Sequence, residues 1–318
     1  MHNGFKDHTN GGWVINQVLI SAKRDCSGTI SNPLTGWSTD FTVRANNITT
    51  LEIPEEQGYH GTNVYETIMQ KGIKVEANDT ISVYCTNIAH VSFDASFVLP
   101  IESLGDEYII QSYDQSHDGS TNSYVYNNET SAFLIVATED NTEIEITPTV
   151  ATLGGRPANE TFTITMNAGE TYHLRSVRTG TQRDLSGTHI LAADCKRIAV
   201  FNGNTVTCIP IDMGNGYDHV FEQAMPLRSW GKNFVVTSSR NLTAISLRLP
   251  QVPTTTKSPE MVFFLSHCKQ DSLTSSTWKK PKARATYKPT IPVPSTSTTT
   301  QATTRAGWEA WATPRWFG

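Results

Sequence analysis

The stretch that decides the fold runs Ser131-Ala132-Phe133-Leu134-Ile135-Val136-Ala137-Thr138-Glu139-Asp140-Asn141-Thr142-Glu143-Ile144-Glu145-Ile146-Thr147 and resumes at 161–172. Within it, Ile144 and Ile146 alternate with glutamates, and further on Phe162 and Ile164 alternate with threonines. A period of two places apolar side chains on one face and polar ones on the other, which predicts half-buried β-strands. The Asp140-Asn141 pair predicts a turn between two such strands.

The same order of strands and turns occurs earlier in the chain, which indicates an internal repeat. Four segments match in sequence order, at offsets that drift from 115 to 126 residues: 22–25 with 137–140, 41–45 with 164–168, 81–84 with 198–201, and 99–108 with 225–234. We therefore predict an all-β protein of two tandem sandwich-like or propeller-like modules, followed by a disordered C-terminal tail. The predicted segments are a disordered start (1–12), a first β module (13–130), a second β module (131–240) and the tail (241–318).

Length and composition agree with this organisation. A chain of 318 residues allows about two domains of ordinary size. Its 37% apolar content is enough for sandwich cores, and only 17% of the residues are charged. The net charge of −5 gives no basic footprint for nucleic acid. No apolar run is long enough to span a bilayer, and the N-terminus contains no hydrophobic signal region.

Several residues between the strands are best explained as turn formers. These are Asp140, Gly169, Gly187, Gly203 and Gly231. Pro100 and Pro226 mark the start of the matching connection in each copy.

Asn-x-Thr sequons point to a secretory pathway. The four within the predicted modules fall in predicted turns or loops and are glycosylation candidates: Asn47, Asn78, Asn128 and Asn159. A fifth, Asn241, begins the tail. The alternative is chance in a chain rich in Asn and Thr. If the sequons are used, we expect a signal peptide that is missing from this sequence.

The cysteines suggest one candidate disulfide. Cys195 and Cys208 bracket the predicted strand at 198–201, and a bridge there would close a short loop. Cys85 lies on an apolar strand face, so buried free thiols remain the alternative. Cys26 lies in a predicted turn.

No catalytic motif is recognisable, and we predict neither enzyme activity nor a cofactor. Asp218-His219 with Glu222 is the nearest approach to a metal or acid–base cluster, but 218 and 219 would point to opposite faces of a strand. A structural histidine is the interpretation we favour. Acidic loops offer oxygen ligands for Ca²⁺ at Asp94, Asp114, Asp118 and Asp140, but their spacing matches no calcium motif.

The tail has a different character. Residues 289–304 are rich in Pro, Thr and Ser, which is typical of a mucin-like stalk or a disordered segment. A second hypothesis is that residues 241–318 are an out-of-frame translation of a third module, because shifted codons for residues 251–263 permit a sequence similar to 137–144.

These motifs together resemble the N-terminal domain family of IgGFc-binding protein. The resemblance covers about residues 14–240 and rests on motifs in the segments 98–108, 137–142, 168–172, 184–190, 198–204, 218–223 and 229–234. It implies an extracellular, β-rich adhesion or mucus-associated module. Binding of immunoglobulin Fc gives the family its name, and we do not carry that activity over to this chain.

We expect a secreted, non-catalytic binding module that is associated with mucus or matrix and binds an extracellular glycoprotein or mucin-type ligand. Neither nucleic acid nor a membrane span is expected. A carbohydrate-binding or carbohydrate-active β protein is the first alternative, and an intracellular structural protein is the second.

Overall fold

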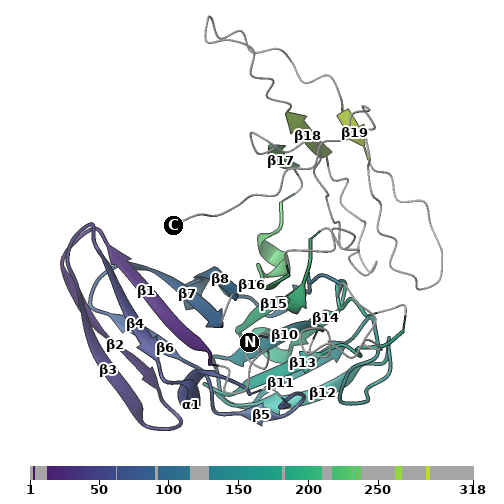
Figure 1. Ribbon diagram of the computed structural model, residues 1–318, viewed down its shortest axis with the longest axis horizontal. Coiled ribbons are helices and arrows are strands. Elements are labelled where there is room, and N and C mark those ends of the chain that lie inside the picture. Colours follow the sequence, from purple (N-terminus) through teal and green to yellow (C-terminus); the bar gives the residue numbers. More distant parts are fainter. Residues whose placement is uncertain are drawn as a thin grey trace, which may run out of the picture. The chain divides into compact units, whose positions relative to one another are not determined.

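The computed structural model describes residues 3, 13–61, 63–89, 92–114, 129–180, 183–209, 217–231, 233–237, 262–266 and 284–286. Strands dominate these residues (Figure 1). Their helical structure consists of the short helix α1 (Glu55–Gly58) and the single-turn 3-10 helices η2 (Ile101–Ser103), η4 (Ala193–Cys195) and η6 (Leu227–Ser229). The all-β prediction is confirmed.

The first module consists of two sheets that share a core. Sheet A has the strand order β4 (Ile48–Ile53), β1 (Ile15–Ala22), β7 (Ile81–Ala89), β8 (Ser92–Val98). Sheet B has the order β3 (Trp37–Val43), β2 (Cys26–Asn32), β6 (Lys74–Ala77). The apolar side chains that they bury together include Val18, Ile20, Ile30, Phe41, Val43 and Ile53.

The second module repeats this plan. Sheet C has the order β16 (Asp218–Gln223), β15 (Ile198–Thr207), β10 (Ser131–Ala137), β13 (Thr171–Arg175), β5 (Ile68–Met69). Sheet D has the order β12 (Phe162–Met166), β11 (Thr142–Thr147), β14 (His189–Ala192), β9 (Glu107–Ile109). In β11 the predicted alternation holds, since Ile144 and Ile146 are fully buried and Glu143 and Glu145 are exposed.

Strand order and register make the two modules copies of one unit. The order β4-β1-β7-β8 in sheet A recurs as β13-β10-β15-β16 in sheet C. Ala22 pairs with Ile81 in the first copy, and Ala137 pairs with Ile198 in the second. Because each of these pairs matches across the repeat, the prediction of two tandem β modules is confirmed.

The turn residues also correspond. The carboxylate of Asp25 accepts a hydrogen bond from the Ala45 amide at 2.7 Å, and that of Asp140 accepts one from the Ala168 amide at 3.0 Å. Gly169 and Gly187 have φ values of +83° and +90°, which favour glycine. Both glycines are therefore the turn formers that we predicted.

Gly203 is a correction to that prediction, because it lies inside β15 and forms no turn. A Cβ atom at Gly203 would stand 1.8 Å from the carbonyl oxygen of Val220 on β16. Glycine is required here by the close approach of two backbones. Gly231 lies just after η6.

Two short strands cross from the first half of the sequence into the second module. In β5, Ile68 and Met69 pair with Tyr172 and Thr171 of sheet C. In β9, Tyr108 pairs with Ile190 of sheet D. Residues 1–229 consequently form one compact unit. The bounds 13–130 and 131–240 stay a prediction.

Side chains, and not a backbone ladder, join the edge strands β8 and β16. Ser92 Oγ, Asp94 Oδ2 and Ser96 Oγ accept hydrogen bonds from the backbone amides 127 positions later, at 3.2, 2.7 and 2.8 Å; the donors are His219, Phe221 and Gln223. Both series ascend along the chain, so the two strands run parallel. We call this arrangement the seam.

The remaining residues, 230–318, form a separate unit. Its described part is a sheet in which β17 (Asn233–Thr237) pairs in parallel with β18 (Val262–Ser266), and β18 pairs with β19 (Arg284–Thr286) in antiparallel fashion. The segment predicted as disordered at 1–12 lies outside the described residues except for Asn3, and the predicted tail lies outside them except for β18 and β19. The out-of-frame hypothesis stays a prediction.

The repeat predicts matched energetic effects of matched core residues. Ile20 and Ile135 occupy equivalent strand positions, and both are fully buried. Ile20→Ala and Ile135→Ala should each lower the free energy of unfolding by about 2–5 kcal/mol, because each leaves a cavity. The measurement is urea denaturation followed by circular dichroism.

The exposed Ile48 supplies the control, since it is 66% exposed. Ile48→Ala should change the free energy of unfolding by less than about 0.5 kcal/mol. A loss of stability confined to one copy's core variant would contradict the equivalence of the modules.

Candidate functional site

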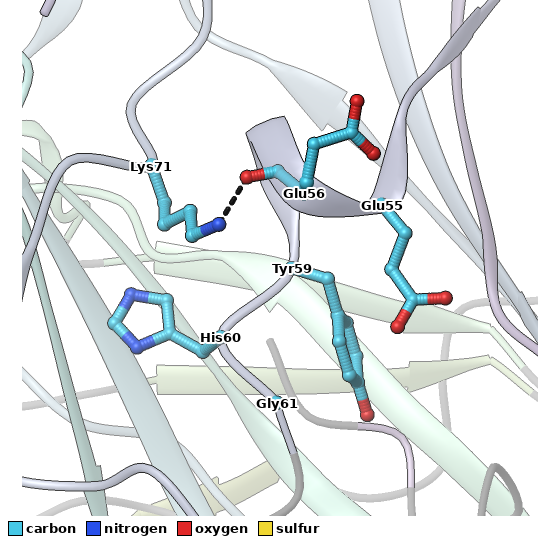
Figure 2. Close-up of a pocket in the computed structure, with 6 residues that line it drawn as sticks. All are labelled: Glu55, Glu56, Tyr59, His60, Gly61 and Lys71. Atoms are coloured by element: carbon cyan, nitrogen blue, oxygen red, sulfur yellow. Dashed lines mark hydrogen bonds between the residues drawn. The ribbon is translucent and has the colours of Figure 1, made fainter. Parts of the chain in front are cut away.

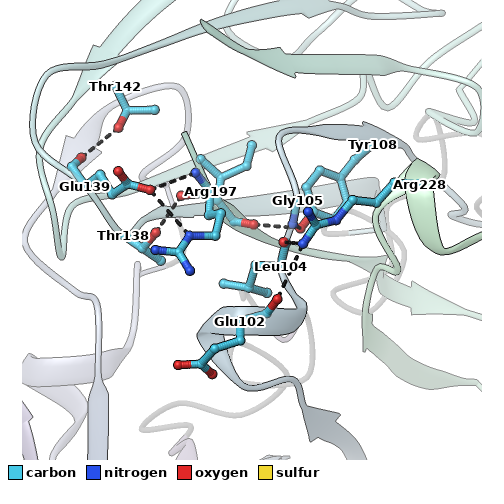
Figure 3. Close-up of polar contacts among 10 residues, drawn as sticks. Glu102, Leu104, Gly105, Tyr108, Thr138, Glu139, Thr142, Arg197 and Arg228 are labelled. Carbon is cyan, nitrogen blue, oxygen red and sulfur yellow. Dashed lines mark hydrogen bonds and ion pairs between the residues drawn. The ribbon is translucent and has the colours of Figure 1, made fainter. Parts of the chain in front are cut away.

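Tyr108, from the motif at 98–108, anchors the start of the second module (Figure 3). Its fully buried hydroxyl donates to the carbonyl of Ile198 at 2.7 Å and accepts from the Gly105 amide at 3.0 Å. Arg228 donates to the carbonyl oxygens of Leu104 and, at 3.4 Å, Glu102. These hydrogen bonds hold η2 and β9 against the second module. Their role is structural, because the polar groups of Tyr108 and Arg228 are used to bind backbone atoms.

The Thr138-Glu139 motif has a similar structural role (Figure 3). Thr138 donates to the carbonyl of Arg197 at 2.5 Å, and a carboxylate oxygen of Glu139 accepts from the Arg197 amide at 3.1 Å. The amide of Arg197, and then its guanidinium, hold the pKa of Glu139 below its ordinary value. The motif thus ties the β10–β11 turn to the start of β15.

The Asp218, His219 and Glu222 cluster does not assemble. His219 is buried and stacks on Phe221 with ring centroids 5.5 Å apart, whereas the Glu222 side chain is exposed. Asp218 accepts a hydrogen bond from the Ser92 hydroxyl at 2.6 Å. Among the described residues, no group of three or more acidic, His or Cys side chains is placed to hold a metal ion. Asp94 and Asp140 instead accept backbone amides at the seam and at a turn.

One open pocket of about 340 Å³ lies beside α1 (Figure 2). Its lining residues are Glu55, Glu56, Tyr59, His60, Gly61 and Lys71. Lys71 donates to the backbone carbonyl of Glu56, which occupies its ammonium group. His60 is 2% exposed and lies between the modules, where its Nε2 is 2.6 Å from the Thr171 hydroxyl. The pocket therefore combines two carboxylates with a lysine that is already hydrogen-bonded to the backbone, and it favours no obvious ligand.

Three of the four predicted glycosylation sites lie at exposed turns. Asn47 lies between β3 and β4, Asn78 lies between β6 and β7, and Asn159 lies between β11 and β12 with φ at +62°. The side chain of Asn78 is bonded to Ser27 through both its amide oxygen and its amide nitrogen. Asn128 and Asn241 lie outside the described residues.

The predicted bridge between Cys195 and Cys208 is not formed. Cys195 is exposed in η4, and Cys208 is buried beyond the far end of β15. A ten-residue strand such as β15 spans about 30 Å, whereas a disulfide needs Cα atoms within about 7 Å of each other. Strand β15 extends well beyond the predicted strand at 198–201, and its length keeps the two sulfur atoms apart.

Two exposed sheet faces were not anticipated from the sequence. On sheet D, the outward side chains are mainly acidic and threonine residues: Glu107, Glu143, Glu145, Thr163, Thr165, His189 and Leu191. On sheet A the outward side chains include seven large apolar ones: Ile15, Leu19, Ile48, Tyr84, Ile88, Phe93 and Phe97. Polar residues, among them Gln17, Glu52 and Thr86, lie between them on the same face. We call these two sheet faces the acidic face and the aromatic face. The pairing register of the strands places the residues of each face side by side. The sequence alone does not give this register.

A family model described as IgGFc binding protein matches residues 94–262, which is more than half of the chain. No curated protein matches. Among solved structures, the chain is similar to vicilin from Corylus avellana (hazelnut) at 10% identity, covering 58% of this chain and 67% of that one. The TM-score of 0.19 is too low to indicate a shared fold.

Two of the buried histidines, His60 and His219, predict an acid-sensitive fold. Burial lowers the pKa of both His60 and His219 from 6.5 to about 3. The unfolded chain therefore binds more protons, so the free energy of unfolding should rise from pH 3 to pH 6.5 by about 1.4 kcal/mol per pH unit for each histidine.

His219→Phe isolates one of these contributions, since neither ring nitrogen of His219 has a hydrogen-bond partner. Burial raises the pKa of the Asp94 and Asp218 carboxyls, which act in the opposite direction. Both carboxyls are present in wild type and in His219→Phe, so their contribution largely cancels when the pH slopes of the two proteins are subtracted. Urea denaturation across this pH range should show a smaller slope in the variant, and an unchanged slope would show that His219 does not titrate on unfolding.

Proposed function

Because the chain belongs to the IgGFc binding protein family, we propose that it is a secreted, non-catalytic adhesion module that binds an extracellular glycoprotein in mucus or matrix. The family membership is the observation that carries this proposal. It favours an extracellular binding role over enzyme activity. The described helices are all too short to cross a lipid bilayer.

The exposed sequons support a secreted protein. Asn47, Asn78 and Asn159 present their side chains at the surface, where an oligosaccharide would not displace core residues. Glycosylation at these positions is part of the proposal. The chain produced behind a signal peptide should lose apparent mass when N-glycans are removed enzymatically.

The acidic face supports the binding role in this proposal, because all of its residues lie within the matched segment 94–262. Glu143 and Glu145 are exposed on β11, and their strand is held rigidly over the core by the buried Ile144 and Ile146. Because the strand backbone is already ordered, binding a partner costs no loop ordering at this face. We infer that this face is the recognition surface, and that it suits a basic patch on the partner.

The test is biolayer interferometry of the glycosylated chain against immobilised mucin and immobilised immunoglobulin Fc, each with and without its own glycans. We expect binding to at least one of these ligands. Glu143→Lys combined with Glu145→Lys should weaken it by about tenfold or more, because charge complementarity is reversed.

Glu76→Lys is the matched control, since Glu76 is exposed on β6 outside the matched segment. It should leave binding unchanged. Absence of binding to all four ligands would count against the proposed function, whereas equal effects of both charge reversals would remove the acidic face as the recognition surface.

A further inference from the structure

The outer faces of sheets A and C are equivalent surfaces of the two copies. In sheet A, one row across the strands consists of Thr50, Leu19, Tyr84 and Phe97. In sheet C, the row at the same register consists of His173, Leu134, Phe201 and Gln223. Because the two rows are equivalent, a difference in their solvent exposure shows that different groups pack against each copy.

In the second module this face is covered. His173 is fully buried, and Gln223 is 6% exposed. The covering groups come from the first module: the His60 ring lies 5.6 Å from the His173 ring, and the Gln223 side chain accepts a hydrogen bond from the Leu99 amide at 2.7 Å. One β module thus covers the outer face of another.

In the first module the same face is open. Tyr84 is 45% exposed, Phe93 is 56% exposed and Phe97 is 43% exposed, and the rings of Tyr84 and Phe97 contact each other at 5.3 Å. Ile48 adds a further apolar side chain that is 66% exposed. Several exposed large apolar side chains on one sheet face mark a site where another surface binds.

We propose that the aromatic face of sheet A is the docking surface for a second copy of this chain, in a two-fold dimer in which the aromatic face contacts itself. Sheet C shows that a face of this type can be covered by a β module. The first-module groups that cover sheet C are already engaged within each chain, so the apolar surface that a second copy can offer is its own aromatic face. Glu52 is the one charged residue on the paired rows of this face, so two copies meet without strong repulsion.

The area of the aromatic face determines how tightly the two copies are expected to bind. Four strands about 4.8 Å apart, with same-face residues about 6.8 Å apart along each strand, give an area of about 400 Å². This is below the ~800 Å² per partner of a typical stable complex. The dimer is therefore weak and depends on concentration. It does not involve the acidic face, so failure of glycoprotein binding leaves it unaffected.

The test is sedimentation velocity of the full chain over a wide range of concentrations. Wild type should shift from monomer to dimer as concentration rises. Phe93→Ser combined with Phe97→Ser should weaken dimerisation by about tenfold or more, since aromatic anchors dominate interfaces. Ile48→Lys should have the same effect, and its exposed position leaves folding intact.

Leu34→Ser is the control, because Leu34 is a partly exposed residue in the turn between β2 and β3 of sheet B. It should dimerise like wild type. A wild-type chain that stays monomeric at every concentration overturns the proposal. So does a dimer that both the double serine variant and Ile48→Lys leave intact, or a face that binds glycan while the chain remains a monomer.

Discussion

Hydrogen bonds from the amides of β16 to the side chains of β8 are the interaction on which the arrangement of residues 1–229 depends. An edge strand presents unpaired backbone amides, and burying such groups without acceptors costs about 1–3 kcal/mol each. Ser92, Asp94 and Ser96 supply the acceptors at every second position. The period of two that builds each strand also brings these three oxygens to one side of β8.

The seam explains why the modules form one unit. Sheets A and B enclose one hydrophobic core, and sheets C and D enclose another, so each sandwich has a core of its own. The seam, together with β5 and β9, joins the two sandwiches, and first-module residues such as His60 and Cys85 then cover the outer face of sheet C. Buried groups such as His173 and the unpartnered ring of His219 lie in this region, which links the acid sensitivity of the fold to the contact between its halves.

Local patterns predicted the copies well and the contacts between them poorly. Alternation in 142–147 and the shared turn residues Asp25 and Asp140 depend on neighbours along the strand or across one hairpin, so the sequence specifies them. The seam joins residues 127 positions apart, and Ser92, Asp94 and Ser96 look like the solvent face of a strand. The Cys195–Cys208 pairing was inferred from spacing alone, without the full length of β15.

The candidate surfaces were unpredictable for the same physical reason. Tyr84, Phe93 and Phe97 are apolar residues that any strand would bury, and only the register and the order β4-β1-β7-β8 place them outward. Motif residues were easier to identify than to interpret. Tyr108 and Glu139 were recognised as family features, yet both act by holding backbone groups.

Amide hydrogen exchange at His219, Phe221 and Gln223 tests the central claim most directly, because these amides have no backbone partner across the seam. The account predicts that all three exchange as slowly as the amides of the central strand β10. It also predicts that Asp94→Ala speeds exchange at Phe221 before the rest of β16. Exchange of all three in the native chain as fast as the exposed turn amides would contradict the account.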